Sequence, residues 1–212
     1  MFDGILFDLD GTLWDATPVM VKVWAELLAR RSDIHRPPVT AQEIQGNMGL
    51  LIDLIGVRMF PGLAEEARIA IMDEFNTLDT ERLARQGGML FPGTEETLAI
   101  LAEQYKLFVV SNCQEGYIEG FYSGNGLGRY FSGAECAGHT GLPKSENIKL
   151  VVERYGLKNP VYIGDTALDC ASAAEAGVPF LHAAYGFGQV ECVNAVTRFS
   201  DIPAALEAMS PP

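Results

Sequence analysis

Near its N-terminus the chain reads Ile5-Leu6-Phe7-Asp8-Leu9-Asp10-Gly11-Thr12-Leu13. The first three residues predict a short strand buried on both faces, and strands of open parallel sheets present ligand-binding residues at their carboxyl ends. Two carboxylates two residues apart follow that strand. They are costly to hold together unless a cation or a shared proton relieves their repulsion. The segment therefore predicts a metal-assisted nucleophile at the end of a strand.

The composition indicates a globular protein. Its 212 residues are sufficient for one hydrophobic core, or for one domain that carries a smaller insert. The net charge of −13 argues against nucleic acid or an anionic membrane surface as a partner, because both require a basic face. A small anionic substrate stays possible, since a bound divalent cation can reverse the local potential.

No apolar segment is long enough to span a bilayer, and the first residues lack the pattern of a signal peptide. The four cysteines show no paired spacing that would indicate a zinc site or a disulfide framework. They are Cys113, Cys136, Cys170 and Cys192. We therefore expect reduced thiols in a cytoplasmic protein without a membrane partner. The sequence indicates no particular oligomeric state.

From about residue 90 onward, short apolar runs alternate with helical patterns. The apolar runs predict strands at 107–110, 131–134, 161–163 and 179–181. The helical patterns cover 93–104, 145–155 and 166–176, and the first begins with an N-cap sequence. Strands and helices in alternation imply right-handed crossovers, so the expected fold is an α/β core with a Rossmann-like parallel sheet.

The segment between about residues 14 and 88 has a different pattern. It carries helix-like apolar spacing over 21–31, 41–59 and 63–85, and no convincing strand. Proline and glycine pairs divide these patterns. We therefore expect an all-helical cap domain at residues 15–88, inserted into an α/β core formed by residues 1–14 and 89–212.

Three later segments hold the side chains that a pair of neighbouring carboxylates would need. They are Ser111-Asn112 after one strand, Gly141-Leu142-Pro143-Lys144 before a helix, and Gly164-Asp165-Thr166-Ala167-Leu168-Asp169 after another strand. If the last helix begins at Thr166, the acids at positions i and i+4 share one face of its first turn. Each segment alone also fits an ordinary turn, a surface lysine or a helix N-cap.

In their order along the chain, these segments resemble the four motifs of the haloacid dehalogenase superfamily. The match covers Asp8-Leu9-Asp10-Gly11-Thr12, Ser111, Lys144 and the Gly-Asp-x-x-x-Asp pattern at 164–169, and it spans nearly the whole chain. The helical insert lies where that superfamily carries its C1-type cap. Three further segments resemble its phosphoglycolate-phosphatase-like branch. They are Phe91-Pro92-Gly93, residues 166–177 and Tyr185-Gly186-Phe187-Gly188.

The resemblance implies a phosphatase whose partner is a small phosphorylated metabolite. Asp8 would be the nucleophile that forms an aspartyl-phosphate, and Asp10 would protonate the leaving oxygen and then deprotonate the attacking water. Mg²⁺ would bind the carboxylates of Asp8 and Asp165 and the main-chain carbonyl of Asp10. Asp169 would act behind these ligands, where it orients a metal-bound water or Lys144.

The resemblance also implies how the phosphate group is held. Ser111 and Lys144 would be catalytic residues that bind phosphoryl oxygens, and Lys144 would neutralise charge on the nucleophile as well. Gly11 gives the chain room to turn beside the ligand, and Thr12 can bond the loop back on itself. The complete set of expected phosphate- or substrate-binding residues is Gly11, Thr12, Ser111, Asn112, Lys144 and, in a loop of the insert, Gly46 and Asn47.

Side chains of the insert would select the substrate, because caps of this kind close over small esters. Arg58 or another arginine of the insert could pair with a carboxylate on the substrate. Trp14 and Trp24 are expected to pack within the insert rather than against the substrate.

Two other functions remain open at this point. A sugar phosphomutase of the same superfamily would share Asp10. Such mutases typically carry a histidine soon after the first motif and a basic, serine-containing loop in the cap, whereas this chain has Met20 and the 46–49 segment there. A protein that binds a phosphate ligand without cleaving it would keep the carboxylates only to hold metal. The intact set of nucleophile, acid, serine, lysine and metal-binding carboxylate favours the phosphatase.

Overall fold

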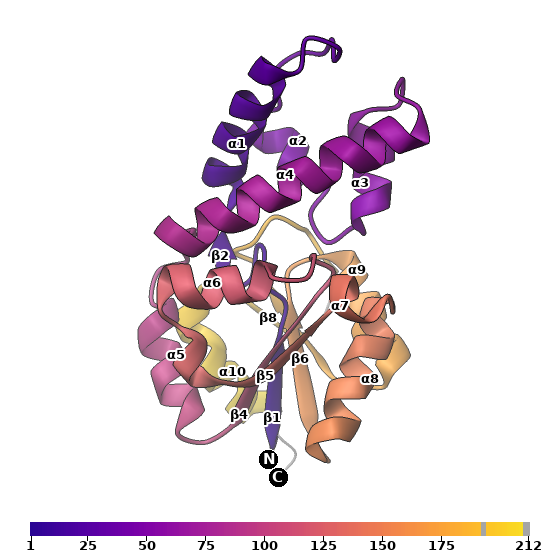
Figure 1. Cartoon of the computed structure of the whole chain (residues 1–212). Helices are drawn as coiled ribbons and strands as arrows, with labels where there is room; N and C mark the ends of the chain where they lie inside the picture. The colour runs from indigo at the N-terminus through magenta and orange to yellow at the C-terminus, as the bar shows by residue number, and fades with distance from the viewer. Residues whose placement is uncertain (192–193, 210–212) are drawn as a thin grey trace.

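The computed structural model describes residues 1–191 and 194–209, and its centre is a six-stranded parallel sheet (Figure 1). The strands follow the order β5-β4-β1-β6-β7-β8. They are β1 (Gly4–Phe7), β4 (Lys106–Ser111), β5 (Phe131–Cys136), β6 (Pro160–Gly164), β7 (Phe180–Ala183) and β8 (Ala195–Val196). The expected parallel α/β sheet is confirmed, and β8 is a short strand that the apolar runs did not reveal.

The strand β1 lies in the middle of the sheet because its side chains are apolar on both faces. Ile5 and Phe7 belong to one hydrophobic cluster, and Leu6 belongs to another. β1 pairs in parallel with β4 on one side and with β6 on the other, so that Phe7 lies opposite Val109 and Ile163. The strand order reverses at β1, and ligands of open α/β sheets bind in the crevice at such a point.

Helices cover both faces of the sheet (Figure 1). One face carries α5 (Thr94–Ala102), α6 (Tyr117–Asn125) and α10 (Ile202–Met209), and the other carries α8 (Lys144–Tyr155) and α9 (Ala167–Ala176). A single helical turn, α7 (Ala137–Thr140), follows β5. The helices expected at 93–104, 145–155 and 166–176 are confirmed as α5, α8 and α9, whereas the patterns did not reveal α6 and α10.

Four helices stand together beyond one end of the sheet, in the violet tones at the top of Figure 1. They are α1 (Thr17–Arg30), α2 (Ala41–Gln45), α3 (Ile52–Met59) and α4 (Glu65–Gln86), and we call them the cap helices. The pattern over 41–59 proves to be two helices. The Thr40 side chain caps α2, and a turn with Gly49 at φ +80° separates α2 from α3.

A two-stranded antiparallel ladder joins the cap helices to the rest of the chain. It pairs β2 (Trp14–Asp15) with β3 (Met89–Leu90), which are the points where the chain enters and leaves the cap helices. The sequence patterns did not predict this pair, because two residues are too few to show the alternation of a strand.

The two tryptophans differ in their surroundings. Trp24 packs within the insert as expected, since its ring stacks on Phe75 of α4 with the ring centroids 4.1 Å apart. The same expectation was wrong for Trp14. Its ring meets Tyr117 and Phe121 of α6 edge-on, at 5.7 and 5.0 Å between centroids, because β2 lies against the α/β core.

Within residues 1–191 and 194–209, no helix combines the length and the apolar character needed to cross a membrane. Cys113, Cys136 and Cys170 are free thiols, as expected. Cys192 lies outside the described residues.

We expect Gly124→Ala to destabilise the fold, because Gly124 lies where α6 approaches the end of α4. A Cβ atom there would overlap the carbonyl oxygen of Leu83 and lie 2.8 Å from the backbone of Gly87. Backbone atoms cannot turn aside as a flexible side chain can, so the free energy of unfolding should fall by about 1–3 kcal/mol in denaturant titrations.

Gly62→Ala is the matched control for this substitution. No atom lies within 4 Å of the Cβ position at Gly62. Its unfolding free energy should stay within about 0.5 kcal/mol of the wild type. Equal stability of the Gly124→Ala variant and the wild type would contradict the close approach of α4 and α6.

Candidate active site

The four motif segments meet at the carboxyl edge of the sheet. Asp8 and Asp165 each follow directly after a strand, β1 and β6, and Ser111 is the last residue of β4. These strands are neighbours in the sheet. Lys144 begins α8 and reaches in from the side. Its Nζ donates to Asp8 Oδ1 at 2.8 Å and to Asp169 Oδ1 at 2.6 Å.

Three buried carboxylates surround this lysine. Asp8, Asp165 and Asp169 each offer an oxygen atom within 4.8 Å of the other two. Asp8 is 3% exposed, and Asp165 and Asp169 are fully buried. When all three are ionised, the single ammonium of Lys144 leaves two negative charges uncompensated. This buried acidic cluster could hold a divalent cation.

Burial is the main reason that the pKa values of the Asp8 and Asp165 carboxyls are high. It raises the pKa of Asp8 from 3.8 to about 7, and the charge of Asp169 adds to the rise while Lys144 opposes it. Burial and the charge of Asp169 also raise the pKa of Asp165 to about 7. Burial disfavours the Lys144 ammonium, yet Asp169 and Asp8 hold its pKa well above the usual range. Without a further cation, Asp8 and Asp165 compete for protons near neutral pH.

Asp169 is held rigidly by both of its carboxylate oxygens. Oδ1 accepts the bond from Lys144, while Oδ2 accepts from the backbone N–H of Thr166 at 3.0 Å and from its hydroxyl at 2.5 Å. Thr166 in turn caps α9, so the two residues form a capping box. Asp165 therefore lies before α9, and the loop that leads into this helix brings Asp165 and Asp169 together. The two acids do not share a face of the first helical turn.

Asp165 is anchored on one oxygen only. Its Oδ2 accepts the backbone N–H of Phe187 at 2.7 Å and that of Gly188 at 3.2 Å. Its Oδ1 is buried and has no hydrogen-bond partner among the described residues. Gly11 makes this approach possible, because it has φ +80° and a Cβ atom there would overlap the Asp165 carboxylate.

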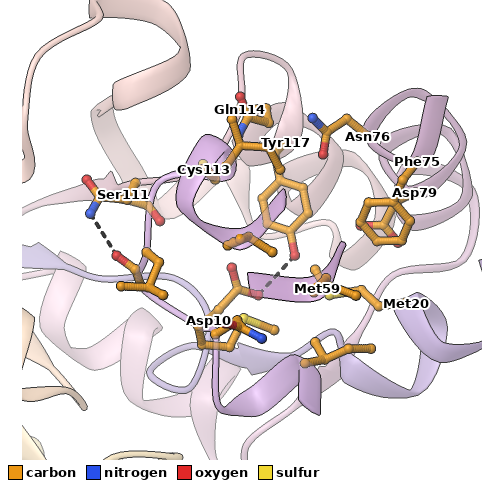
Figure 2. Close-up of a pocket in the computed structure, with 18 of the residues that line it drawn as sticks. Asp10, Met20, Met59, Phe75, Asn76, Asp79, Ser111, Cys113, Gln114 and Tyr117 are labelled. Atoms are coloured by element: carbon orange, nitrogen blue, oxygen red, sulfur yellow. Dashed lines mark hydrogen bonds between the residues drawn. The ribbon is translucent and has the colours of Figure 1, made fainter. Parts of the chain in front are cut away.

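Asp10 is fixed by two aromatic residues. The indole N–H of Trp14 donates to its Oδ1 at 2.9 Å. The hydroxyl of Tyr117 donates to the same oxygen at 2.9 Å (Figure 2). Burial raises the Asp10 pKa to about 7, with a further rise from Asp8, while these two hydrogen bonds oppose it. Sequence reasoning did not find either partner. Tyr117 is more than a hundred residues from Asp10 in the chain, and the sequence predicted only a packing role for Trp14.

The expected phosphate-binding residues lie around the same edge. Ser111 and Asn112 line the pocket above Asp8. Asn112 Nδ2 donates to the carbonyl of Gly49 at 2.8 Å, whereas its Oδ1 is buried without a partner in the described chain. The Thr12 hydroxyl is also buried and has no hydrogen-bond partner among the described residues. Backbone hydrogen bonds therefore close the loop after β1, including the bond that Leu13 N–H donates to Leu9 C=O at 2.9 Å.

The pocket continues from the acidic edge to the cap helices (Figure 2). It encloses about 730 Å³ of free space, part of it open to solvent. Asn47 and Gly49 lie in its wall. Gly46 is not among the described lining residues, and its carbonyl lies 3.5 Å from Arg58 Nη1. The wall also contains Phe75, Asn76 and Asp79 of α4, which no sequence motif had indicated.

Comparison with known sequences and structures agrees with this geometry. The family model for haloacid dehalogenase-like hydrolases matches residues 5–183. A solved structure described as a haloacid dehalogenase-like family hydrolase from Streptococcus pneumoniae superposes with a TM-score of 0.80. Its sequence is 20% identical, and the match covers 97% of this chain and 98% of that one. At that identity the likeness concerns the fold alone.

Two curated relatives are named as phosphatases. The probable phosphatase IndB of Dickeya dadantii is 26% identical over 97% of this chain and 94% of its own length. The phosphoglycolate phosphatase of Caulobacter vibrioides is 29% identical over 95% of this chain and 89% of its own length. The resemblance to the phosphoglycolate-phosphatase-like branch is thereby confirmed. The chain belongs to the haloacid dehalogenase-like hydrolase family, and it groups with the phosphatases of that family.

Proposed function

We propose that this chain is a magnesium-dependent phosphatase that hydrolyses small phosphate monoesters through an aspartyl-phosphate on Asp8. The observation that carries the proposal is the buried contact of Asp8 with Lys144, beside the unpaired Oδ1 of Asp165. A carboxylate nucleophile needs both a fixed position and nearby positive charge to accept a phosphoryl group, and these residues are arranged to provide them.

The residues present fit a magnesium ion. Asp165 Oδ1 is a buried carboxylate oxygen without a partner among the described residues, and hard oxygen ligands suit Mg²⁺. We propose that the carboxylates of Asp8 and Asp165 and the main-chain carbonyl of Asp10 hold the ion. Asp169 would instead position Lys144, since both of its oxygens already accept hydrogen bonds. A bound ion would neutralise charge on the phosphoryl oxygens.

In the first step, Asp8 attacks phosphorus and the bond from phosphorus to the leaving oxygen breaks. Lys144 holds Asp8 Oδ1, so the attack falls to Oδ2. Asp10 donates its proton to the leaving oxygen, which departs as an alcohol. A carboxyl pKa of about 7 suits this role, because a large fraction of Asp10 is protonated near neutral pH. Trp14 and Tyr117 hold Asp10 Oδ1 and leave Oδ2 for the proton transfer.

In the second step, water attacks phosphorus and the bond from phosphorus to Asp8 breaks. Asp10, now a carboxylate, takes the proton of that water. The products are inorganic phosphate and the free Asp8 carboxylate, so the residues return to their starting state. Ser111, Asn112 and Lys144 would hold the phosphoryl oxygens through both steps.

The assignment of domains is part of the same proposal. Residues 15–88 would act as a cap that closes over the ester, and residues 1–14 and 89–212 would act as the catalytic core. Asn47 would contact the substrate from the cap, with Gly46 shaping its loop. No observation favours a phosphomutase or a non-catalytic phosphate-binding protein over the phosphatase.

Asp8→Asn should reduce Mg²⁺-dependent phosphate release by on the order of 10⁴-fold or more, because an amide cannot form the aspartyl-phosphate. Phosphate release from p-nitrophenyl phosphate, followed with Mg²⁺ and with chelator, measures this loss. Asp53→Asn, at an exposed position of α3, is the matched control and should retain activity. Turnover by the Asp8→Asn variant at a rate near that of the wild type would remove Asp8 as the nucleophile.

Asp10→Asn should slow the hydrolysis of alkyl phosphates much more than that of p-nitrophenyl phosphate in the first chemical step. The physical reason is that nitrophenolate leaves without protonation, whereas an alkoxide does not. Rapid-quench measurement of the first step on the two esters tests this difference. An equal loss of rate on both esters would mean that Asp10 does not protonate the leaving oxygen and only stabilises the loop after β1.

Mg²⁺ should raise the melting temperature more at pH 8 than at pH 5. The folded-state pKa values of Asp8, Asp10 and Asp165 are about 7, against 3.8 in an ordinary setting. A raised pKa stabilises the folded state at low pH, and that contribution is lost as pH rises from about 4 through 7. More of these carboxyls are ionised at pH 8, so a cation that compensates their charge stabilises the folded state more at pH 8 than at pH 5. Thermal melts in chelator and in Mg²⁺ measure the two shifts.

Asp165→Asn is the control for this pH effect. Without metal, its stability should fall less steeply between pH 4 and 7 than that of the wild type, because one titrating carboxyl is missing. Its Mg²⁺-dependent shift at pH 8 should also shrink. Identical pH profiles for the two proteins would exclude Asp165 from the titration.

A further inference from the structure

The cap side of the pocket differs in chemistry from the catalytic side. Its wall is built mainly from apolar side chains of the cap helices and the loops between them; six of these residues are Met20, Trp24, Ile44, Ile55, Met59 and Phe75. Figure 2 shows Met20, Met59 and Phe75 together on the side away from Ser111. Among the described residues that line the pocket, none is a lysine or an arginine.

One carboxyl group interrupts this apolar wall. Asp79 lies on the inner face of α4, is 2% exposed, and has no hydrogen-bond partner for Oδ1 in the described part of the chain. Asn76, three residues earlier on α4, also lines the pocket. A buried carboxyl without a partner is costly, so a role with a ligand is the simplest reason for its presence.

A cation that could have paired with Asp79 is used elsewhere. Arg82 is three residues further along α4, within reach in a helix. Its guanidinium instead donates two hydrogen bonds to Glu26 of α1, at 3.0 and 2.7 Å. Burial and the charge of Asp10 raise the pKa of Asp79 well above its usual range, with partial opposition from Arg82. A carboxyl group keeps an acceptor oxygen in either protonation state, and a cationic donor would favour its ionised form. Asp79 therefore faces the pocket as an acceptor with an unpaired Oδ1.

We propose that the substrate is a phosphate ester of a largely apolar alcohol that carries an amine or hydroxyl group, which donates a hydrogen bond to Asp79. This inference rests on the proposed phosphatase function and specifies its substrate class. With the phosphate at Asp8, the rest of the ester must occupy the cap side of the pocket. Its carbon chain would contact the apolar wall, and its donor would satisfy the free oxygen of Asp79.

The same geometry disfavours a leaving group that carries a carboxylate. Such a group would share the pocket with Asp8, Asp10 and Asp79, and the nearest buried cation, Lys144, is already bonded to Asp8 and Asp169. Arg58 was one of the arginines of the insert considered as a partner for a substrate carboxylate. It is exposed and points its Nη1 at Asn47 Oδ1, 3.4 Å away. Burying one more anion without a cation is unfavourable.

A matched set of esters tests this proposal. The set is butyl phosphate and its derivatives with an amino, a hydroxyl or a carboxylate group on the terminal carbon, with p-nitrophenyl phosphate as the general substrate. With Mg²⁺, kcat/KM of the wild type should be highest for the amino and hydroxyl derivatives. The carboxylate derivative should fall on the order of 10-fold or more below butyl phosphate.

Asp79→Asn identifies the residue responsible. In this variant the ratio of kcat/KM for the amino derivative over butyl phosphate should fall by on the order of 10-fold, because the amide is a weaker partner for an ammonium. Asp73→Asn, on the exposed side of the same helix, should leave the ratio unchanged. A thermal melt of each variant verifies that it is folded.

Each other outcome overturns a defined part of this account. A preference for the carboxylate derivative that is lost in Arg58→Gln would make Arg58 the selecting residue and refute the role of Asp79. Equal kcat/KM for all butyl esters, or an unchanged ratio in Asp79→Asn, would also refute it. In both cases hydrolysis of p-nitrophenyl phosphate by the wild type, lost in Asp8→Asn, would leave the phosphatase function intact. No hydrolysis of any ester would refute the proposed function itself.

Discussion

The ammonium of Lys144 lies buried between the carboxylates of Asp8 and Asp169, at 2.8 and 2.6 Å, and the organisation of the site depends on this contact. Removing three charged groups from water is expensive, and only close geometry offsets that cost. The contact joins the end of β1 to the first turns of α8 and α9. It forms only if the parallel sheet brings those segments to one edge.

The same contact leaves the edge with excess negative charge. Asp165 adds a third buried carboxylate, and burial, with a smaller contribution from the charge of Asp169, raises the pKa values of Asp8 and Asp165 to about 7. A protein under selection for stability alone would avoid such a cluster, and strained electrostatics of this kind are typical of functional sites. The excess charge, together with the free Oδ1 of Asp165, makes the edge receptive to a cation.

The pocket combines two surfaces of different origin. The sheet edge supplies polar and charged groups that suit phosphate chemistry, whereas the cap helices supply an apolar wall with Asp79 as its isolated carboxyl. A shared fold does not by itself define a substrate, because the groups that contact the leaving group lie on the variable part. Proteins with the same sheet edge can therefore act on different esters, and the described residues that line this pocket include no lysine or arginine.

The sequence by itself determined the parallel α/β core, the helical insert and the residues Asp8, Ser111, Lys144 and Asp165 that meet at the sheet edge. These features depend on local patterns, since apolar runs and the residues that directly follow them can be read in short windows. Only the tertiary structure decided the partners of Asp10, the pairing of β2 with β3 and the isolation of Asp79. Those features depend on contacts between segments far apart in the chain. A helical aspartate such as Asp79 has the same local pattern whether it faces solvent or a pocket, and packing of α4 over the sheet edge alone makes the difference.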